Sequence, residues 1–381
     1  MKTPDVGSAS RRVRQLFGTL TEAAPVTSQH ENLLVRTGLP NTLDAQDIER
    51  RLQFNAPGAL NDQERAGVAA ELVKRAREAL DVIAGEGLEG QLSGSQRLGL
   101  EAVLQIRGRP SLRVLENDLE DLRLYPGAHV WDAVVDLHLH DILAASRSTG
   151  ALRVRDLLFS YSPWVQGTVW IVAPTLVMTN RHVLFPPAQG QALARRLPGT
   201  MAAQLKPEFE LTVDFAFYTG SNREEHYRVI DVPFVAAADD PVDVALLQVE
   251  HVSGPLQVPL SLSQQAAGDL DYLYIVGHPG RLQHVPDEVN SVFGDPDERK
   301  RVSFGRRYAS EEPDPDELVH DASTIGGFSG GPVLGFLEGE VRALHYWGDP
   351  EYGNRAISAR ALRKHAQLQA ILASGRGDCA T

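Results

Sequence analysis

Three short segments carry side chains that could together attack a carbonyl group. A histidine segment, an aspartate segment and a glycine-rich serine segment centre, in chain order, on His182, Asp243 and Ser329. A serine hydroxyl becomes a good nucleophile only when a base removes its proton. A histidine can be that base at neutral pH, and a buried carboxylate can hold its ring in the required tautomer. These residue types predict Ser329 as the nucleophile, His182 as the base and Asp243 as the partner that orients the base.

The glycines around Ser329 meet a second requirement of the same chemistry. When a carbonyl is attacked its oxygen becomes negative, and backbone N–H groups must point at it. Gly327 lets the chain turn so that its own N–H and that of Ser329 converge, which predicts an oxyanion hole made by these two residues. The chemistry needs no metal ion and no organic cofactor, and we expect neither.

Each of these segments, taken alone, also has an ordinary structural interpretation. Asp243 could simply begin a strand, His182 could be a surface or core polar group, and the glycines around Ser329 could form a plain turn. The presence of all three in the order His, Asp, Ser favours catalysis over the three separate structural explanations.

The elements that must position these side chains change in character near residue 150. Before it, apolar residues recur at three- and four-residue steps, which predicts helices at 11–20, 45–52, 61–83 and 131–146. After it, short apolar runs separated by glycine and proline predict strands of a barrel or sandwich at 167–173, 176–179, 210–218, 242–249, 272–277, 332–337 and 341–346. Two helices are predicted within this β region, at 189–197 and 359–373.

Composition limits the class of protein further. The chain has 381 residues, 43% of them hydrophobic and 23% charged, which is ordinary for a folded protein of two or three domains. A net charge of −13 makes nucleic acid a poor partner. No apolar run is long enough to span a membrane, and the first 30 residues lack the apolar core of a secretory signal. With Cys379 as its only cysteine, the chain cannot form an internal disulfide, and we expect a cytoplasmic protein.

The β region resembles the chymotrypsin-like serine peptidases, and within them the V8-like glutamyl endopeptidases. The resemblance covers roughly residues 152–370 and rests on Gly167-Thr168, 179–183, 243–247, Gly277-His278-Pro279, 321–332 and 344–348. It implies an all-β, trypsin-like double barrel at 151–375. The helical patterns before it predict an all-α domain at 1–150, so we expect an α+β chain. Barrel 1 is expected at about 152–252, barrel 2 at about 255–358 and a closing helix at about 359–373.

The same resemblance implies a substrate pocket. It places Thr324 and His345 where V8-like enzymes bind an acidic P1 side chain, with Ser323, Trp347 and Gly348 beside them. Ser323 stands where an aspartate would hold lysine or arginine, so the pocket is expected to take either an acidic or a small or apolar P1 residue. A protonated imidazole would add charge to the binding of an acidic side chain.

Phe328 departs from the pattern of trypsin-type zymogens, which carry there an aspartate that pairs with a newly cut N-terminus. Activation by N-terminal cleavage is therefore not expected, and residues 1–150 become the candidate regulatory or partner-binding region.

We expect an intracellular bacterial serine endopeptidase that acts on protein or peptide substrates. Its fused helical domain resembles the adaptor domains found beside bacterial trypsin-like effectors, which implies a role in defence or cell-death signalling. Two alternatives stay open at this point: a catalytically silent scaffold that keeps the protease fold, and a quality-control protease of the HtrA type.

Overall fold

A computed structural model describes most of the chain from residue 44 onward. The described residues are 44–55, 62–85, 93, 95–96, 99, 102–103, 108–125, 128–159, 162–186, 191–265, 272–280, 297–308, 314–324, 327–336, 339–348 and 354–377. The helix predicted at 11–20 and the first residue of the helix predicted at 61–83 lie outside them. Within them, no helix is both long and apolar enough to cross a membrane.

The first barrel closes from six antiparallel strands. In barrel order these are β8 (His226–Val235), β7 (Phe209–Asp214), β2 (Thr149–Asp156), β3 (Trp164–Ala173), β4 (Leu176–Thr179) and β9 (Ala245–His251), with β9 pairing back onto β8. A short hairpin of β5 (Ala194–Arg196) and β6 (Ala203–Leu205) extends from β8. Alternate side chains of several of these strands point inward, so aliphatic residues such as Val169, Ile171 and Leu247 fill one continuous core.

The second barrel also closes from six antiparallel strands. In barrel order these are β11 (Arg301–Tyr308), β10 (Tyr272–Gly277), β13 (Pro332–Gly335), β14 (Val341–Trp347), β15 (Asn354–Ser358) and β12 (Glu317–His320), with β12 pairing back onto β11. The β12 strand pairs with β11 only at Arg307 and Tyr308. The short strand β1 (Ser111–Arg113), from far earlier in the chain, pairs with residues 301–303 of the same β11.

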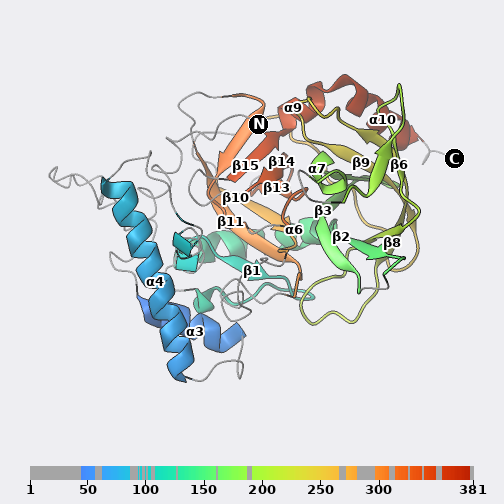
Figure 1. The fold of residues 1–381 in the computed structure, drawn as a ribbon. Coiled ribbons are helices and arrows are strands. Elements are labelled where there is room, and N and C mark those ends of the chain that lie inside the picture. Colours follow the sequence, from blue (N-terminus) through green and yellow to red (C-terminus); the bar gives the residue numbers. More distant parts are fainter. Residues whose placement is uncertain are drawn as a thin grey trace.

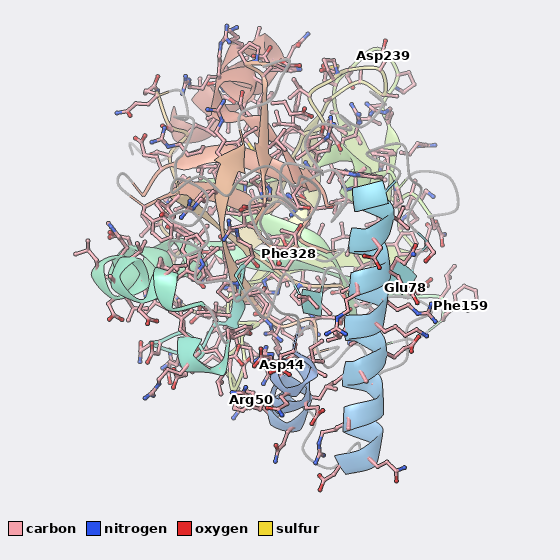
Figure 2. The ribbon with its side chains drawn as sticks, turned by 90° about the vertical axis from the view of Figure 1, so that its left-hand side faces the viewer. Asp44, Arg50, Glu78, Phe159, Asp239 and Phe328 are labelled. Atoms are coloured by element: carbon pink, nitrogen blue, oxygen red, sulfur yellow. The ribbon has the colours of Figure 1, made fainter. Side chains whose placement is uncertain are left out.

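The helices lie around the two barrels (Figure 1). They are α3 (Ala45–Asn55), α4 (Asp62–Gly85), the 3-10 turns η2 (Leu122–Leu124) and η3 (Ala128–Trp131), α6 (Asp132–Arg147), the single turn α7 (Arg181–Leu184), α9 (Ala359–Lys364) and α10 (Ala366–Gly377). The pair α3 and α4 lies at one edge of the molecule, whereas α6 lies against the barrels. In the side view, Asp44 and Arg50 mark this edge and Phe328 lies within the barrel body (Figure 2).

The region before the first barrel is thus partly built into the second. Trp131, at the start of α6, lies with its ring 5.5 Å from Phe304 and 6.5 Å from Phe336 of the barrel. Val135, Ile142 and other α6 residues share a core with barrel strands. The α+β fold class and the double barrel are confirmed. The domain boundary near residue 150 stays a prediction, and β1 is a strand within the region predicted to be helical.

The predicted helices at 45–52, 61–83, 131–146 and 359–373 are confirmed with shifted ends, the last one divided at His365. The helix predicted at 189–197 is wrong, because Ala194–Arg196 forms β5 instead. Pairing with β6 satisfies its backbone, and the Leu193 N–H donates to the Leu184 carbonyl. Such tertiary pairing overrides the local helical preference of the segment.

Candidate active site

The ends of two paired strands bring His182 and Asp243 together. In the ladder between β4 and β9, Thr179 lies opposite Ala245, so the residues just beyond each strand end are neighbours. The Asn180 side chain donates to the Asp243 carbonyl at 2.8 Å. The His182 N–H donates to one Asp243 carboxylate oxygen at 3.0 Å, and the ring Nδ1 lies 2.6 Å from the other. Both carboxylate oxygens therefore face His182, one holding its backbone and one its ring.

Asp243 is held in its ionised form. Burial alone would raise its pKa, but the hydrogen bond from the His182 ring and the charges of His182 and Arg181 lower the pKa below the usual value. Arg181 contributes from 3.7 Å. An ionised carboxylate on Nδ1 keeps the proton on that nitrogen, which leaves Nε2 available to accept a proton.

The turn that carries Ser329 is tied to both barrels. From barrel 1, the Thr168 N–H donates to the Ser329 carbonyl at 2.9 Å. From barrel 2, the Gly330 N–H donates to the His345 carbonyl at 2.9 Å. Gly330 has a φ of +89°, and a side chain there would collide with the Thr168 carbonyl oxygen. Glycine is therefore required for the close approach that fixes Ser329 between the barrels.

Gly167 shows how near the serine turn lies to the histidine helix. A Cβ atom built on Gly167 would lie 3.0 Å from the Val183 side chain and 3.2 Å from the Ser329 carbonyl oxygen. Val183, the residue after His182, and Ser329 thus lie against the same glycine of β3. The Ser329 hydroxyl makes no hydrogen bond with the described residues. Hydrogen bonds of this kind commonly form only when substrate binds.

The predicted oxyanion donors point to no protein acceptor. Among the described residues, neither the Gly327 N–H nor the Ser329 N–H donates a hydrogen bond. Gly327 has a φ of +103°, as the expected turn requires. Two backbone donors on either side of Phe328 are therefore available to a ligand at the mouth of the turn.

Thr168 is a residue whose role the sequence did not reveal. Its hydroxyl donates to the Gly327 carbonyl at 2.9 Å and accepts from the His278 N–H at 3.0 Å. One buried side chain thus joins β3 of barrel 1 to the turn that contains Gly327 and to His278, which follows β10. The Gly167-Thr168 motif was the available signal, but sequence spacing alone does not say what the hydroxyl touches.

Phe328 is an apolar residue at the position where trypsin-type zymogens carry an aspartate. Its side chain is buried in a small core with Ile275, Val333 and Ala343. The ring packs on Gly277 so closely that a side chain there would collide with it. The serine turn is therefore held by packing in the structure as it stands, with no part for a terminal amine among these contacts.

The five predicted pocket residues lie on two neighbouring stretches. Ser323 and Thr324 follow β12 and are buried, His345 lies buried in β14, and Trp347 and Gly348 end that strand and are exposed. Gly348 faces Thr324, because a Cβ atom there would lie 2.9 Å from the Thr324 hydroxyl. The buried hydroxyls of Ser323 and Thr324 have no hydrogen-bond partner among the described residues.

The buried position of His345 favours a neutral imidazole. Burial, together with the charge of His182, lowers its pKa to about 3. Its Nδ1 lies 3.2 Å from Nε2 of the equally buried His320, which the sequence did not single out.

The chain is similar to several known proteins. Residues 167–344 match the family model of the trypsin-like peptidase domain. A probable serine protease of Lysobacter enzymogenes is 24% identical, with 92% of this chain and 96% of that protein aligned. The serine protease Rv3671c of Mycobacterium tuberculosis is also 24% identical, over 62% of this chain and half of that protein's length.

Two solved structures of Rv3671c were also found to be similar. The inactive form of a serine-to-alanine mutant has a TM-score of 0.38 at 19% identity, covering 62% of this chain and 93% of that one. The active form has a TM-score of 0.37 at 19% identity, covering 60% and 82%.

The family match and the closed double barrel identify residues 167–344 as a trypsin-like peptidase domain of the chymotrypsin-like class. The serine-protease relatives, one of them aligned over nearly its whole length, support peptidase function for this chain.

Proposed function

We propose that the chain is a serine endopeptidase in which Ser329, His182 and Asp243 form the catalytic triad. The observation that carries this proposal is the orientation of His182, whose backbone and ring are both held by the Asp243 carboxylate, at 3.0 and 2.6 Å. A histidine fixed in this way beside a turn that exposes a serine has the arrangement that acyl transfer requires.

The residues then have distinct roles in the reaction. His182 Nε2 takes the proton of the Ser329 hydroxyl as its oxygen bonds to the substrate carbonyl carbon. The N–H groups of Gly327 and Ser329 stabilise the negative oxygen that results. His182 gives its proton to the leaving amine, the peptide bond breaks and an acyl ester remains on Ser329. Water, deprotonated by His182, then hydrolyses the ester and restores the serine.

A fluorophosphonate probe tests the nucleophile directly, because it bonds only to an activated serine. We expect the wild type to be labelled at Ser329, and the variants Ser329→Ala and His182→Ala to be unlabelled. Ser374→Ala is the matched control, since Ser374 is an exposed serine on α10 that bonds only its own helix. A folded wild type that no fluorophosphonate labels would support the scaffold alternative instead.

We propose further that the pocket prefers an acidic P1 side chain. The hydroxyls of Ser323 and Thr324 are buried without partners, and a carboxylate can accept hydrogen bonds from both. An apolar P1 residue would displace water and leave these hydroxyls unsatisfied. The neutral His345 can also hydrogen-bond a carboxylate, and a nearby carboxylate would raise its pKa.

Peptides that differ only at P1 test this preference. With Glu, Gln, Ala and Leu at P1, we expect kcat/KM for Glu to exceed that for Ala by about tenfold or more. Thr324→Val should reduce this ratio, whereas Thr200→Val should not, since Thr200 is an exposed threonine that bonds only within its own loop. Preferred cleavage after Leu or Ala would contradict the acidic assignment and leave the triad proposal standing.

The first 150 residues are proposed to regulate this activity by binding a protein partner. The support is structural, because β1 and α6 of this region are built into the second barrel.

A further inference from the structure

Arg109 comes from the segment before β1, well outside the part of the chain that matches the peptidase family. Its side chain nevertheless ends beside the substrate pocket. Its Nη2 lies 2.6 Å from an Asp321 carboxylate oxygen, and the two side chains are 1% and 0% exposed. Asp321 stands two residues before the pocket residue Ser323 and eight before Ser329. The pair therefore joins two distant parts of the chain, 212 residues apart, inside the molecule.

The body of the protein fixes the Arg109 end of this pair. The Arg109 Nη1 donates to the Gly108 carbonyl at 2.8 Å, and the same carbonyl accepts from the Trp131 indole at 3.0 Å. The guanidinium also lies 5.7 Å from the centre of the Trp131 ring. The next residue, Pro110, accepts from the Phe304 N–H at 3.1 Å, which continues the ladder between β1 and β11. Arg109 is thus a rigid support and not a surface side chain.

The Asp321 end fixes the segment that leads into the pocket. The second carboxylate oxygen of Asp321 accepts from the Arg306 N–H at 2.6 Å, and the Asp321 N–H donates to the Arg306 carbonyl at 3.1 Å. The following residue, Ala322, packs directly on Gly305, where any side chain would collide with it. Its carbonyl accepts from the Asn354 side chain. Ser323 and Thr324 continue from this clamped point into the pocket.

We propose that Arg109 is a positioning residue for P1 selection, acting through Asp321 on the pocket residues Ser323 and Thr324. The inference rests on the proposed peptidase function. Asp321 spans from Arg109 to β11, so loss of the guanidinium leaves a buried carboxylate charge without this cation. The carboxylate then loses one of the contacts that fix its position, and Ala322 through Thr324 can shift with it. A displacement of about 1 Å at such a site can cost about a hundredfold in the affected rate.

Two readouts on the full-length protein separate positioning from general stability. The first is the ratio of kcat/KM between the P1 residue that the wild type prefers and alanine, measured well below the unfolding temperature. The second is the rate at which a small alkyl fluorophosphonate, which does not fill the pocket, labels Ser329. For Arg109→Met we expect the P1 ratio to fall by about 10- to 100-fold through KM. The labelling rate should stay within about threefold of the wild type.

Three further variants keep the test decisive. Arg109→Lys keeps the charge and should regain part of the P1 ratio. The double variant Arg109→Met with Asp321→Asn removes both charges, so it should regain stability towards urea while its P1 ratio stays low. Arg123→Met is the matched control, because Arg123 pairs with Asp121 at 2.5 Å in the same region but is 88% exposed. It should behave as the wild type does.

The outcomes distinguish this inference from the function on which it rests. If the wild type is labelled and P1-selective, and Arg109→Met keeps that selectivity, Arg109 has no positioning role. The same conclusion follows if the double variant regains selectivity together with stability, because the pair would then be merely structural. If Ser329 of the wild type is never labelled, the proposed function fails and the positioning role fails with it.

Discussion

Removing the Thr168 hydroxyl should both weaken folding and slow catalysis. Thr168→Val keeps the shape of the side chain and deletes both hydrogen bonds, the one donated to the Gly327 carbonyl and the one accepted from the His278 N–H. Both backbone groups lie beside a fully buried side chain. Leaving a buried polar group unsatisfied costs about 1–3 kcal/mol, so the two together predict a loss of about 2–6 kcal/mol in the free energy of unfolding.

The effect on catalysis follows from what the bond to Gly327 holds. It fixes the peptide that carries one proposed oxyanion donor, and loss of such a donor typically costs about 10²–10³ in kcat. Since the donor is displaced and not deleted, we expect kcat to fall by about 10- to 100-fold with KM nearly unchanged.

The assay is steady-state hydrolysis of one chromogenic peptide, with urea unfolding of the same preparations. Thr149→Val is the control. Thr149 is an equally buried threonine whose hydroxyl donates to the Ala145 carbonyl at 2.9 Å, at the end of α6. It should lose stability and keep its kcat. Equal kcat values in the two variants would refute the role assigned to Thr168.

Two further expectations concern charge. Asp243→Asn should lower kcat by about 10³–10⁴-fold in the same assay, because the amide cannot stabilise the protonated His182 ring. Acid should destabilise the fold through His345: its pKa of about 3 lies below the unfolded value of 6.5, so stability present above pH 6.5 is lost as the pH falls towards 3. His345→Gln should reduce the slope of unfolding free energy against pH by up to about 1.4 kcal/mol per unit in this window, whereas the exposed His140→Gln should not. Buried His278, whose pKa is also lowered, leaves a residual slope in both.

The residues of the proposed triad could be found from the sequence because each lies beside a strand with a strong local pattern. Strands such as β4 and β10 have the predicted bounds for the same reason. The pair of Arg109 and Asp321 could not be found, because it depends on β1 pairing with β11 across some 190 residues of sequence. The local periodicity of apolar residues does not show which distant strands pair. The helix prediction at 189–197 was wrong for a related reason. Pairing of β5 with β6, and not the residues of the segment itself, decided its conformation.

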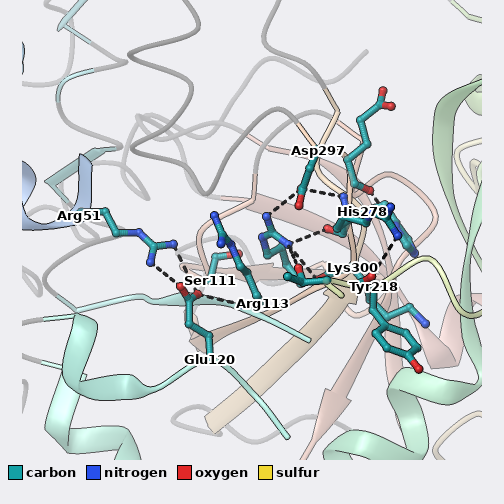
Figure 3. A network of polar contacts seen from close by, with 12 residues as sticks. Arg51, Ser111, Arg113, Glu120, Tyr218, His278, Asp297 and Lys300 are labelled. Carbon is teal, nitrogen blue, oxygen red and sulfur yellow. Dashed lines mark hydrogen bonds and ion pairs between the residues drawn. The ribbon is translucent and has the colours of Figure 1, made fainter. Parts of the chain in front are cut away.

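The helix pair α3 and α4 reaches the barrels by a different kind of contact from α6. The two helices share a small core of their own, which includes Ile48, Leu52 and Leu72. Arg51 of α3 is joined to the barrel body by a buried ion pair with Glu120, at 2.6 Å (Figure 3). Burial would raise the pKa of Glu120, but the charge of Arg51 and its hydrogen bond lower it, so the pair is ionised.

Glu120 also binds the backbone of β1, so it connects Arg51 to that strand. Its second carboxylate oxygen accepts from the Arg113 N–H at 3.1 Å and from the Tyr125 hydroxyl at 2.8 Å. The same Tyr125 hydroxyl lies 2.9 Å from the Ser111 carbonyl oxygen, so its one proton is shared between the two acceptors. Arg109 lies two residues before Ser111, so these contacts connect α3 to the strand that follows Arg109. Buried ion pairs are sensitive to geometry, because a small separation leaves two charges unpaired. A partner bound to the helix pair could therefore change P1 selection without touching the barrels.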